Sequence, residues 1–195
     1  MGKKQWIYDM PDVALLHKEL KRERYNRRFR HILRSTINAL IVVAAIAALL
    51  ATLVLPVLQI AGTSMEPSLM DGDIVLLVKS EKLKTGDLCA FYYSNKILIK
   101  RIIGTPGDYL WINPDGTVYL NSEELIEPYL SEKALGECDV EFPYQVPENN
   151  YFMMGDHRET SIDSRSSVIG CIAQDQIIGK ILCKVWPLSD FEWIG

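Results

Sequence analysis

Residues 72–104 read GDIVLLVKSEKLKTGDLCAFYYSNKILIKRIIG, and this stretch decides the fold of the larger part of the chain. Three apolar, β-branched or aromatic runs occur in it, at 74–78, 88–93 and 96–103, and turn residues separate them. Short runs of this kind between turn signals predict β-strands. Ser94 and Asn95, between the second and third runs, predict a hairpin.

The same pattern of short apolar runs between turn residues continues toward the C-terminus. Further runs lie at 109–112, 117–120, 151–154, 169–173 and 177–186. Strands of about five residues at intervals of roughly ten predict a mainly β domain, a compact sandwich or partly closed barrel. The acidic, irregular segment 123–139 predicts a surface excursion or a short helix, and residues 60–188 contain no convincing amphipathic helical window.

On the N-terminal side of these predicted strands the sequence becomes uniformly apolar. Residues 36–58 read TINALIVVAAIAALLATLVLPVL, and no charged residue occurs between Ser35 and Met65. A helix of this length spans about 34 Å, enough to cross a bilayer and long for a buried core helix. The run also exceeds the apolar region of a cleaved signal peptide. We therefore expect an uncleaved transmembrane signal-anchor helix over 35–58.

The charge distribution divides the chain at this helix. Residues 1–34 contain ten Lys or Arg and four acids, whereas the rest contains eleven bases and twenty-one acids, for a net charge of −4 overall. The positive-inside bias predicts a single-pass plasma membrane protein with a basic cytoplasmic segment at 1–34 and an extracytoplasmic domain at 59–195. A basic cluster beside a spanning helix favours the lipid bilayer as partner over nucleic acid.

The cysteines give no indication of a metal site. Cys89, Cys138, Cys171 and Cys183 form no CxxC pair, and His157 is the single histidine after the apolar run. No metal and no cofactor are therefore expected. Both disulfides and buried free thiols are compatible with this pattern.

Three segments differ from ordinary strands and turns. The first, residues 62–69 (GTSMEPSL), places Ser64 between Gly and Pro, a composition typical of a rigid exposed turn.

The second segment is residues 98–104 (LIKRIIG), in which Lys100 and Arg101 must point to opposite faces of a strand. A lysine buried among isoleucines has a lowered pKa and can act as a general base, which arginine cannot. Residues 155–165 (GDHRETSIDSR) form a polar run able to brace a site.

Together these segments resemble the type I signal peptidase family, in the single-anchor form of Gram-positive bacteria. The matching motifs lie at 64–69, 72–75, 100–108 and 155–165, in family order, and the resemblance runs from about residue 36 to 187. The resemblance implies a serine–lysine dyad, with Ser64 as nucleophile and Lys100 as general base. It also implies that Ser161 orients the lysine and that Asp163 and Arg165 form a supporting ion pair.

The resemblance further implies secretory precursor proteins as partners, cut after Ala-x-Ala-like sequences. The Ser64 backbone N–H is expected in the oxyanion hole, without side-chain help because position 62 is Gly. The implied pocket walls are Ile60, Met65, Leu69, Leu98 and Ile99. The chain departs from the family pattern at His157, at residues 159–160 and in the length of segment 166–169. Because segment 123–139 is short, the resemblance implies no large second domain.

Four alternatives remain at this point. Ser64, His157 and either Asp156 or Asp163 would form a Ser–His–Asp hydrolase, a reading that makes His157 indispensable. A non-catalytic assembly factor of the same fold would be expected to lack Ser64 or Lys100. A dedicated pilin or surface-fibre peptidase would use the same dyad on other precursors. A self-cleaving repressor would carry a DNA-binding domain instead of the anchor.

Overall fold

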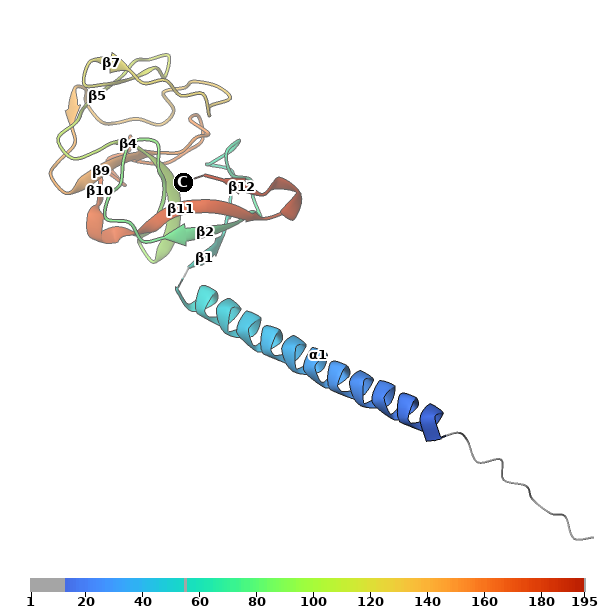
Figure 1. Cartoon of the computed structure of the whole chain (residues 1–195). Coiled ribbons are helices and arrows are strands. Elements are labelled where there is room, and N and C mark those ends of the chain that lie inside the picture. The colour runs from blue at the N-terminus through green and yellow to red at the C-terminus, as the bar shows by residue number, and fades with distance from the viewer. Residues whose placement is uncertain (1–12, 55, 195) are drawn as a thin grey trace, which may run out of the picture. The chain divides into compact units, whose positions relative to one another are not determined.

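The computed structural model describes residues 13–54 and 56–194 (Figure 1). Two compact units divide the chain, Met1–Leu53 and Val54–Gly195.

The first unit contains one long helix, α1 (Val13–Val54). Within its segment His17–Leu49 an 18-residue window has a mean hydropathy of 2.1, and the helix is long and apolar enough to cross a membrane. The predicted spanning helix over 35–58 starts inside α1, which begins at Val13, but it extends too far at its C-terminal end, because residues 57–58 belong to strand β1 (Val57–Gln59). Pro56 accounts for the earlier end, since proline lacks the N–H that would continue a helix.

The second unit is built on an antiparallel sheet in the order β1-β2-β11-β3-β4-β9-β10, with β12 paired to β11. After β1, its strands are β2 (Ile74–Val78), β3 (Leu88–Tyr93), β4 (Lys96–Gly104), β9 (Asn150–Met154), β10 (Ile172–Ala173), β11 (Ile177–Trp186) and β12 (Glu192–Trp193). Figure 1 shows this sheet curling around on itself. The curl brings the end of β1 and the start of β4 to opposite walls of one cavity. The predicted mainly β fold is therefore confirmed.

A smaller sheet follows the order β7-β6-β5-β8. Its strands are β5 (Tyr109–Ile112), β6 (Val118–Leu120), β7 (Glu123–Glu124) and β8 (Tyr144–Gln145). The predicted helical alternative for 123–139 is wrong, because the segment begins with β7 and contains no helix. Two short 3-10 helices, η1 (Gln174–Gln176) and η2 (Leu188–Asp190), complete the domain.

Successive side chains of β4 and β9 point alternately to the two faces of the sheet, and each face has its own hydrophobic core. Ile103 and Phe152 join a cluster that packs against Leu110 of the smaller sheet. Their neighbours Ile102 and Met153 belong to another cluster on the opposite face. Successive side chains of a strand point to opposite faces, so both faces of this central strand pair are buried.

Two tight turns follow from the sequence. Ser94 and Asn95, with φ of 42° and 66°, join β3 to β4 as the predicted two-residue hairpin. Asn121 and Ser122, with φ of 52° and 73°, make the equivalent exposed tip between β6 and β7. The first hairpin sets the register of β4, in which Lys100 lies opposite Cys89.

All four cysteines are free thiols. Cys89 and Cys183 are buried, whereas Cys138 and Cys171 are half-buried. Burial raises the pKa of Cys89 to about 12, with the Asp87 carboxylate adding to the effect. Cys89 is therefore a protonated apolar packing residue, and none of the four cysteines forms a cross-link.

Candidate active site

Ser64 lies in a pinned loop that connects β1 to β2. The Gly62 N–H donates to the Asp71 carboxylate at 2.8 Å, and Gly62 has a φ of 96°, a conformation that glycine adopts without strain. Met65, next to the serine, is buried in the core below the loop. Anchoring on both sides holds Ser64 half-exposed at a fixed place.

Lys100 reaches this serine from the middle of β4. Its Nζ lies 2.8 Å from the Ser64 Oγ and 2.9 Å from the Ser161 Oγ, and the residue is 4% exposed. Burial lowers the pKa of Lys100 to about 8; the Asp163 carboxylate opposes this shift, and the Arg165 guanidinium adds to it. The structure thus places a lysine with an accessible neutral form against a serine hydroxyl.

Gly155 makes this close packing possible. A Cβ at position 155 would overlap the Ser161 hydroxyl and the Ser64 carbonyl. The same carbonyl accepts the His157 N–H at 3.1 Å, so the 155–161 loop is docked directly on the nucleophile loop. Sequence reasoning assigned no role to Gly155, although its position at the start of the polar run was a signal.

Asp163 and Arg165 form the predicted ion pair, completely buried, with two hydrogen bonds of 2.8 Å. Burial alone would raise the pKa of Asp163, but hydrogen bonds and the charge of Arg165 hold the pKa below its usual value. The Asp163 carboxylate also accepts the Gly155 N–H at 2.9 Å. Arg165 continues outward to the Leu135 carbonyl at 2.6 Å, and it donates to the Ser161 carbonyl at 3.3 Å.

Arg101 is a further buried charge that sequence reasoning left without a partner. Its guanidinium donates to both Asp156 oxygens, at 2.8 and 2.6 Å, and to the Ser68 hydroxyl at 3.1 Å. The Tyr129 ring centre lies 3.8 Å from the guanidinium carbon. The expectation that Lys100 and Arg101 point apart is consistent with these separate partners, although both side chains are buried.

Glu127 is the residue that the sequence analysis missed most completely. Both of its oxygens accept hydrogen bonds from Arg158, and both side chains are fully buried. Arg158 also donates from Nε to the Gly155 carbonyl at 3.0 Å, and Tyr129 donates its hydroxyl to Glu127 at 2.8 Å. We call residues 127–136 the strap, because they tie the smaller sheet to the 155–165 loop.

An apolar groove of about 110 Å³ opens beside Ser64 and Lys100. Four of the five predicted wall residues line it, namely Ile60, Met65, Leu98 and Ile99. Leu69 does not line it, because that side chain is fully buried in the core. Within the described residues, β1 pairs only with β2, and residues 96–100 of β4 pair only with β3. The groove therefore lies between two strand edges with free backbone groups.

Comparisons with known proteins identify the family of this chain. A family model described as signal peptidase, peptidase S26, matches residues 33–186. A signal peptidase I of Bacillus licheniformis is 33% identical over 169 residues, which cover 80% of this chain and 90% of the relative. A signal peptidase IB of Staphylococcus aureus (strain MRSA252) is 35% identical over 154 residues, covering 69% and 79%.

Among solved structures, a signal peptidase I from Enterococcus faecalis V583 is 28% identical, with a TM-score of 0.42 over 51% of this chain and 97% of that one. The family match and the named relatives define the class of protein, a serine endopeptidase and hence a hydrolase. The chain belongs to the signal peptidase family, peptidase S26. The predicted family is therefore confirmed.

Proposed function

We propose that this protein is a membrane-anchored endopeptidase that removes signal peptides from exported precursors with a Ser64–Lys100 dyad. One observation carries the proposal. Lys100 Nζ is buried 2.8 Å from the Ser64 Oγ, and its pKa is lowered to about 8. A base whose pKa lies near the working pH is the one best suited to accept a proton from a serine.

The chemistry follows from these atoms. The neutral Lys100 amine takes the hydroxyl proton as the Ser64 Oγ attacks the scissile carbonyl carbon. The C–N bond then breaks, and the lysine ammonium returns its proton to the leaving nitrogen. Water, deprotonated by the same amine, next attacks the ester between the signal peptide and Ser64. Hydrolysis frees the signal peptide's carboxyl end and restores Ser64.

The backbone N–H of Ser64 suits the oxyanion. It has no hydrogen-bond partner among the described residues, so it is available to the oxygen that becomes charged. Such a preorganised donor supplies about 2.7–4 kcal/mol of transition-state stabilisation. No side chain adds to it from position 62, which is Gly.

Ser161, Asp163 and Arg165 act on the lysine rather than on the substrate. The Ser161 hydroxyl accepts one Lys100 N–H at 2.9 Å, which leaves the lone pair of the neutral amine free to face Ser64. The Asp163–Arg165 pair fixes the loop that presents Ser161. Groups held in this way keep reacting atoms within reach, where a displacement of about 1 Å lowers a rate roughly 100-fold.

The groove supports the proposed cleavage after small residues. Free edges of β1 and β4 face it, and an extended peptide added there would form main-chain hydrogen bonds. The groove is small, about 110 Å³, and bulky side chains wall it. We therefore propose Ala-like residues at the two inward positions before the scissile bond. Leu69 contributes only from the core below.

The membrane arrangement is proposed from the charge pattern. Ten bases in residues 1–34 support a cytoplasmic N-terminus, and the apolar stretch of α1 supports a single membrane crossing. The catalytic domain would then lie on the side where exported precursors emerge.

The geometry disfavours a Ser–His–Asp mechanism. The His157 ring is hydrogen-bonded to the Thr160 hydroxyl at 2.7 Å. Both candidate carboxylates are engaged by arginines, Asp156 by Arg101 and Asp163 by Arg165. The presence of both Ser64 and Lys100 also argues against a non-catalytic assembly factor.

Cleavage of a secretory precursor by the detergent-solubilised full chain tests the proposal. The wild type should cut after a small residue, and Ser64→Ala and Lys100→Ala should each lose at least 1,000-fold in kcat/KM, within the range for removing a catalytic group. His157→Ala should retain cleavage. Near-normal cleavage by Lys100→Ala, or inactivity of His157→Ala in a folded protein, would contradict the dyad.

A further inference from the structure

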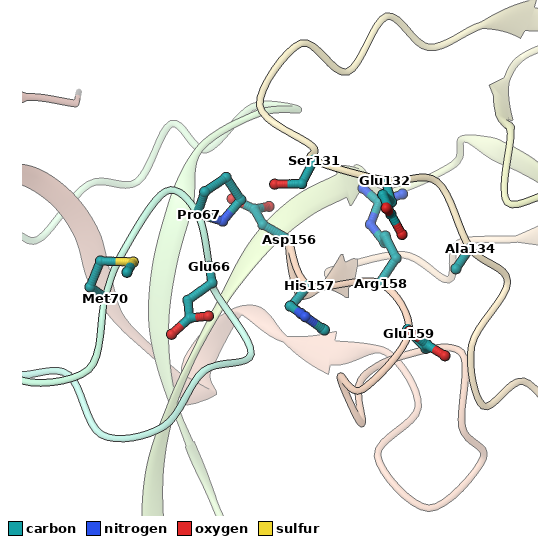
Figure 2. A pocket seen from close by; sticks show the side chains of 10 residues that line it. All are labelled: Glu66, Pro67, Met70, Ser131, Glu132, Ala134, Asp156, His157, Arg158 and Glu159. Atoms are coloured by element: carbon teal, nitrogen blue, oxygen red, sulfur yellow. The ribbon is translucent and has the colours of Figure 1, made fainter.

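A second cavity, of about 400 Å³, begins two residues after Ser64 and shares no lining residue with the apolar groove. We call it the polar pocket. Figure 2 shows the three segments around it, one from the nucleophile loop, one from the strap and one from the 155–165 loop. Its lining residues are Glu66, Pro67, Met70, Ser131, Glu132, Ala134, Asp156, His157, Arg158 and Glu159.

The nucleophile loop stands between the groove and the polar pocket. Ser64 lines the groove, whereas its carbonyl accepts the N–H of His157, which lines the polar pocket. A peptide cut at Ser64 has residues on both sides of the scissile bond. If the groove holds those before the bond, the adjoining polar pocket is the concavity available to those after it.

The polar pocket carries an excess of negative charge. Two of its charged residues are neutralised within the domain, Asp156 by Arg101 and Arg158 by Glu127. Its other three carboxylates, those of Glu66, Glu132 and Glu159, have no ion-pair partner among the described residues. An unneutralised concave surface of one sign attracts the opposite charge and repels its own.

We propose that the polar pocket binds the first residues of the mature segment, and that it favours cationic over acidic side chains there. This inference rests on the proposed function, because it needs Ser64 to be the point of cleavage. The occupant is an extended peptide with a basic or neutral side chain within three residues after the scissile bond.

The three unpaired carboxylates of the polar pocket would also attract the new N-terminus of the mature protein. Cleavage frees an α-amino group, whose ordinary pKa of about 7.7–8.0 makes it mostly protonated at neutral pH. A protonated amine has no lone pair with which to attack the acyl-enzyme ester. By favouring this cation, the polar pocket opposes re-formation of the peptide bond.

Buried contacts hold the pocket walls in place. Arg158 is tied to Glu127 of the strap, and Arg101 pairs with Asp156 beneath the Tyr129 ring. The acidic side chains of the strap and loop therefore project from a rigid base, and the pocket need not form on binding. Glu132 and Glu159 are exposed, so they can be changed without disturbing the core.

Peptide cleavage by the full chain in detergent tests the inference. Two substrates share an Ala-x-Ala sequence before the scissile bond and differ only in Lys or Glu at the second position after it. The wild type should prefer the Lys substrate by about 1.4- to fivefold in kcat/KM per effective carboxylate, the range that an exposed charge pair gives. The double variant Glu132→Gln/Glu159→Gln should lose most of that preference.

A charge-matched control is Glu137→Gln/Glu148→Gln, which removes two exposed carboxylates that do not line the pocket. This control should keep the wild-type preference. Equal cleavage of both substrates by the wild type, or an unchanged preference in the pocket variant, would overturn the inference while leaving the proposed function intact. Failure of the wild type to cut either substrate would instead overturn the proposed function, and this inference with it.

Discussion

Gly155 lies so close to Ser161 that a methyl group at position 155 would overlap the Ser161 hydroxyl. The methyl group would also overlap the Ser64 carbonyl, so it would push against both partners of Lys100 at once. The approach of the two loops, and not only the presence of the dyad, therefore determines the geometry of the site.

Gly155→Ala should lower kcat/KM by at least 100-fold, because displacing Ser64 or Ser161 by about 1 Å is sufficient for such a loss. Gly170→Ala is the matched control. Its added methyl group meets nothing within 4 Å, although its φ of 62° imposes about 1–2 kcal/mol of strain. The control should unfold at a lower temperature yet keep near-normal kinetics, and equal kinetic losses in both variants would contradict this reading.

The rate of cleavage should rise with pH through the pKa of Lys100. Because that pKa is lowered to about 8, only about one molecule in ten holds the neutral amine at pH 7. We expect log kcat/KM to increase with unit slope up to about pH 8 and then to level off. A stopped assay on a substrate without titratable side chains measures this profile. A midpoint near the ordinary lysine value of 10.5 would show that burial does not tune the base.

Removing Asp163 should move that midpoint downward. Its carboxylate attracts the Lys100 ammonium and so raises the pKa, whereas the remaining Arg165 lowers it. Asp163→Asn also breaks a buried ion pair, a change that typically costs about 3–5 kcal/mol of unfolding free energy. The pH profile of the folded fraction separates the two effects, since loss of stability alone would lower the rate without shifting the midpoint.

Lys100→Met should give a more stable but inactive protein at neutral pH. The folded pKa of Lys100 is below the unfolded one, so the unfolded chain binds more protons between about pH 8 and 10.5. Stability from this group is therefore lowest below pH 8 and increases as the pH rises. We expect Lys100→Met to gain roughly 1–3 kcal/mol at pH 7, with the gain shrinking toward pH 10.5, in urea unfolding at several pH values. A gain that does not vary with pH would not come from the buried charge.

The strap should contribute far more to stability than an ion pair at the surface. Glu127→Gln leaves Arg158 buried with no carboxylate partner, which should cost about 3–5 kcal/mol. The pair between Lys133 and Glu124 lies nearby but is exposed, so Glu124→Gln should cost less than about 1 kcal/mol. Urea unfolding of the two variants gives the comparison, and similar losses would show that the buried pair has no special role.

Most of the strands were predictable from the sequence, because each apolar run ends at a turn residue. The strands at 74–78, 88–93, 109–112 and 177–186 have the predicted limits. The ends of α1 were not predictable from the sequence. Apolar composition indicates where a helix can cross a membrane, but it does not indicate where the backbone hydrogen bonds of the helix stop. Val57 and Leu58 are as apolar as the residues before them, yet they pair with β2.

The candidate site was predictable to a smaller extent. The resemblance indicated Ser64, Lys100, Ser161 and the Asp163–Arg165 pair, and the structure brings all of them together. Glu127 was not predictable, because its partner Arg158 is 31 residues away and no local pattern connects them. Leu69 was assigned to the wrong environment, since an apolar residue near a groove can equally face the core beneath it.

The hydrogen bond from Arg165 to the Leu135 carbonyl also determines where the chain tolerates added sequence. Gly136 follows in the strap, and a side chain at this position would overlap the Arg158 carbonyl. An epitope or reporter inserted there would therefore pull the strap away from Arg158 and Arg165, which support the dyad. The exposed tip at Asn121 and Ser122 makes no comparable contact with the 155–165 loop. A tag placed at that tip would label the catalytic domain while leaving its active site assembled.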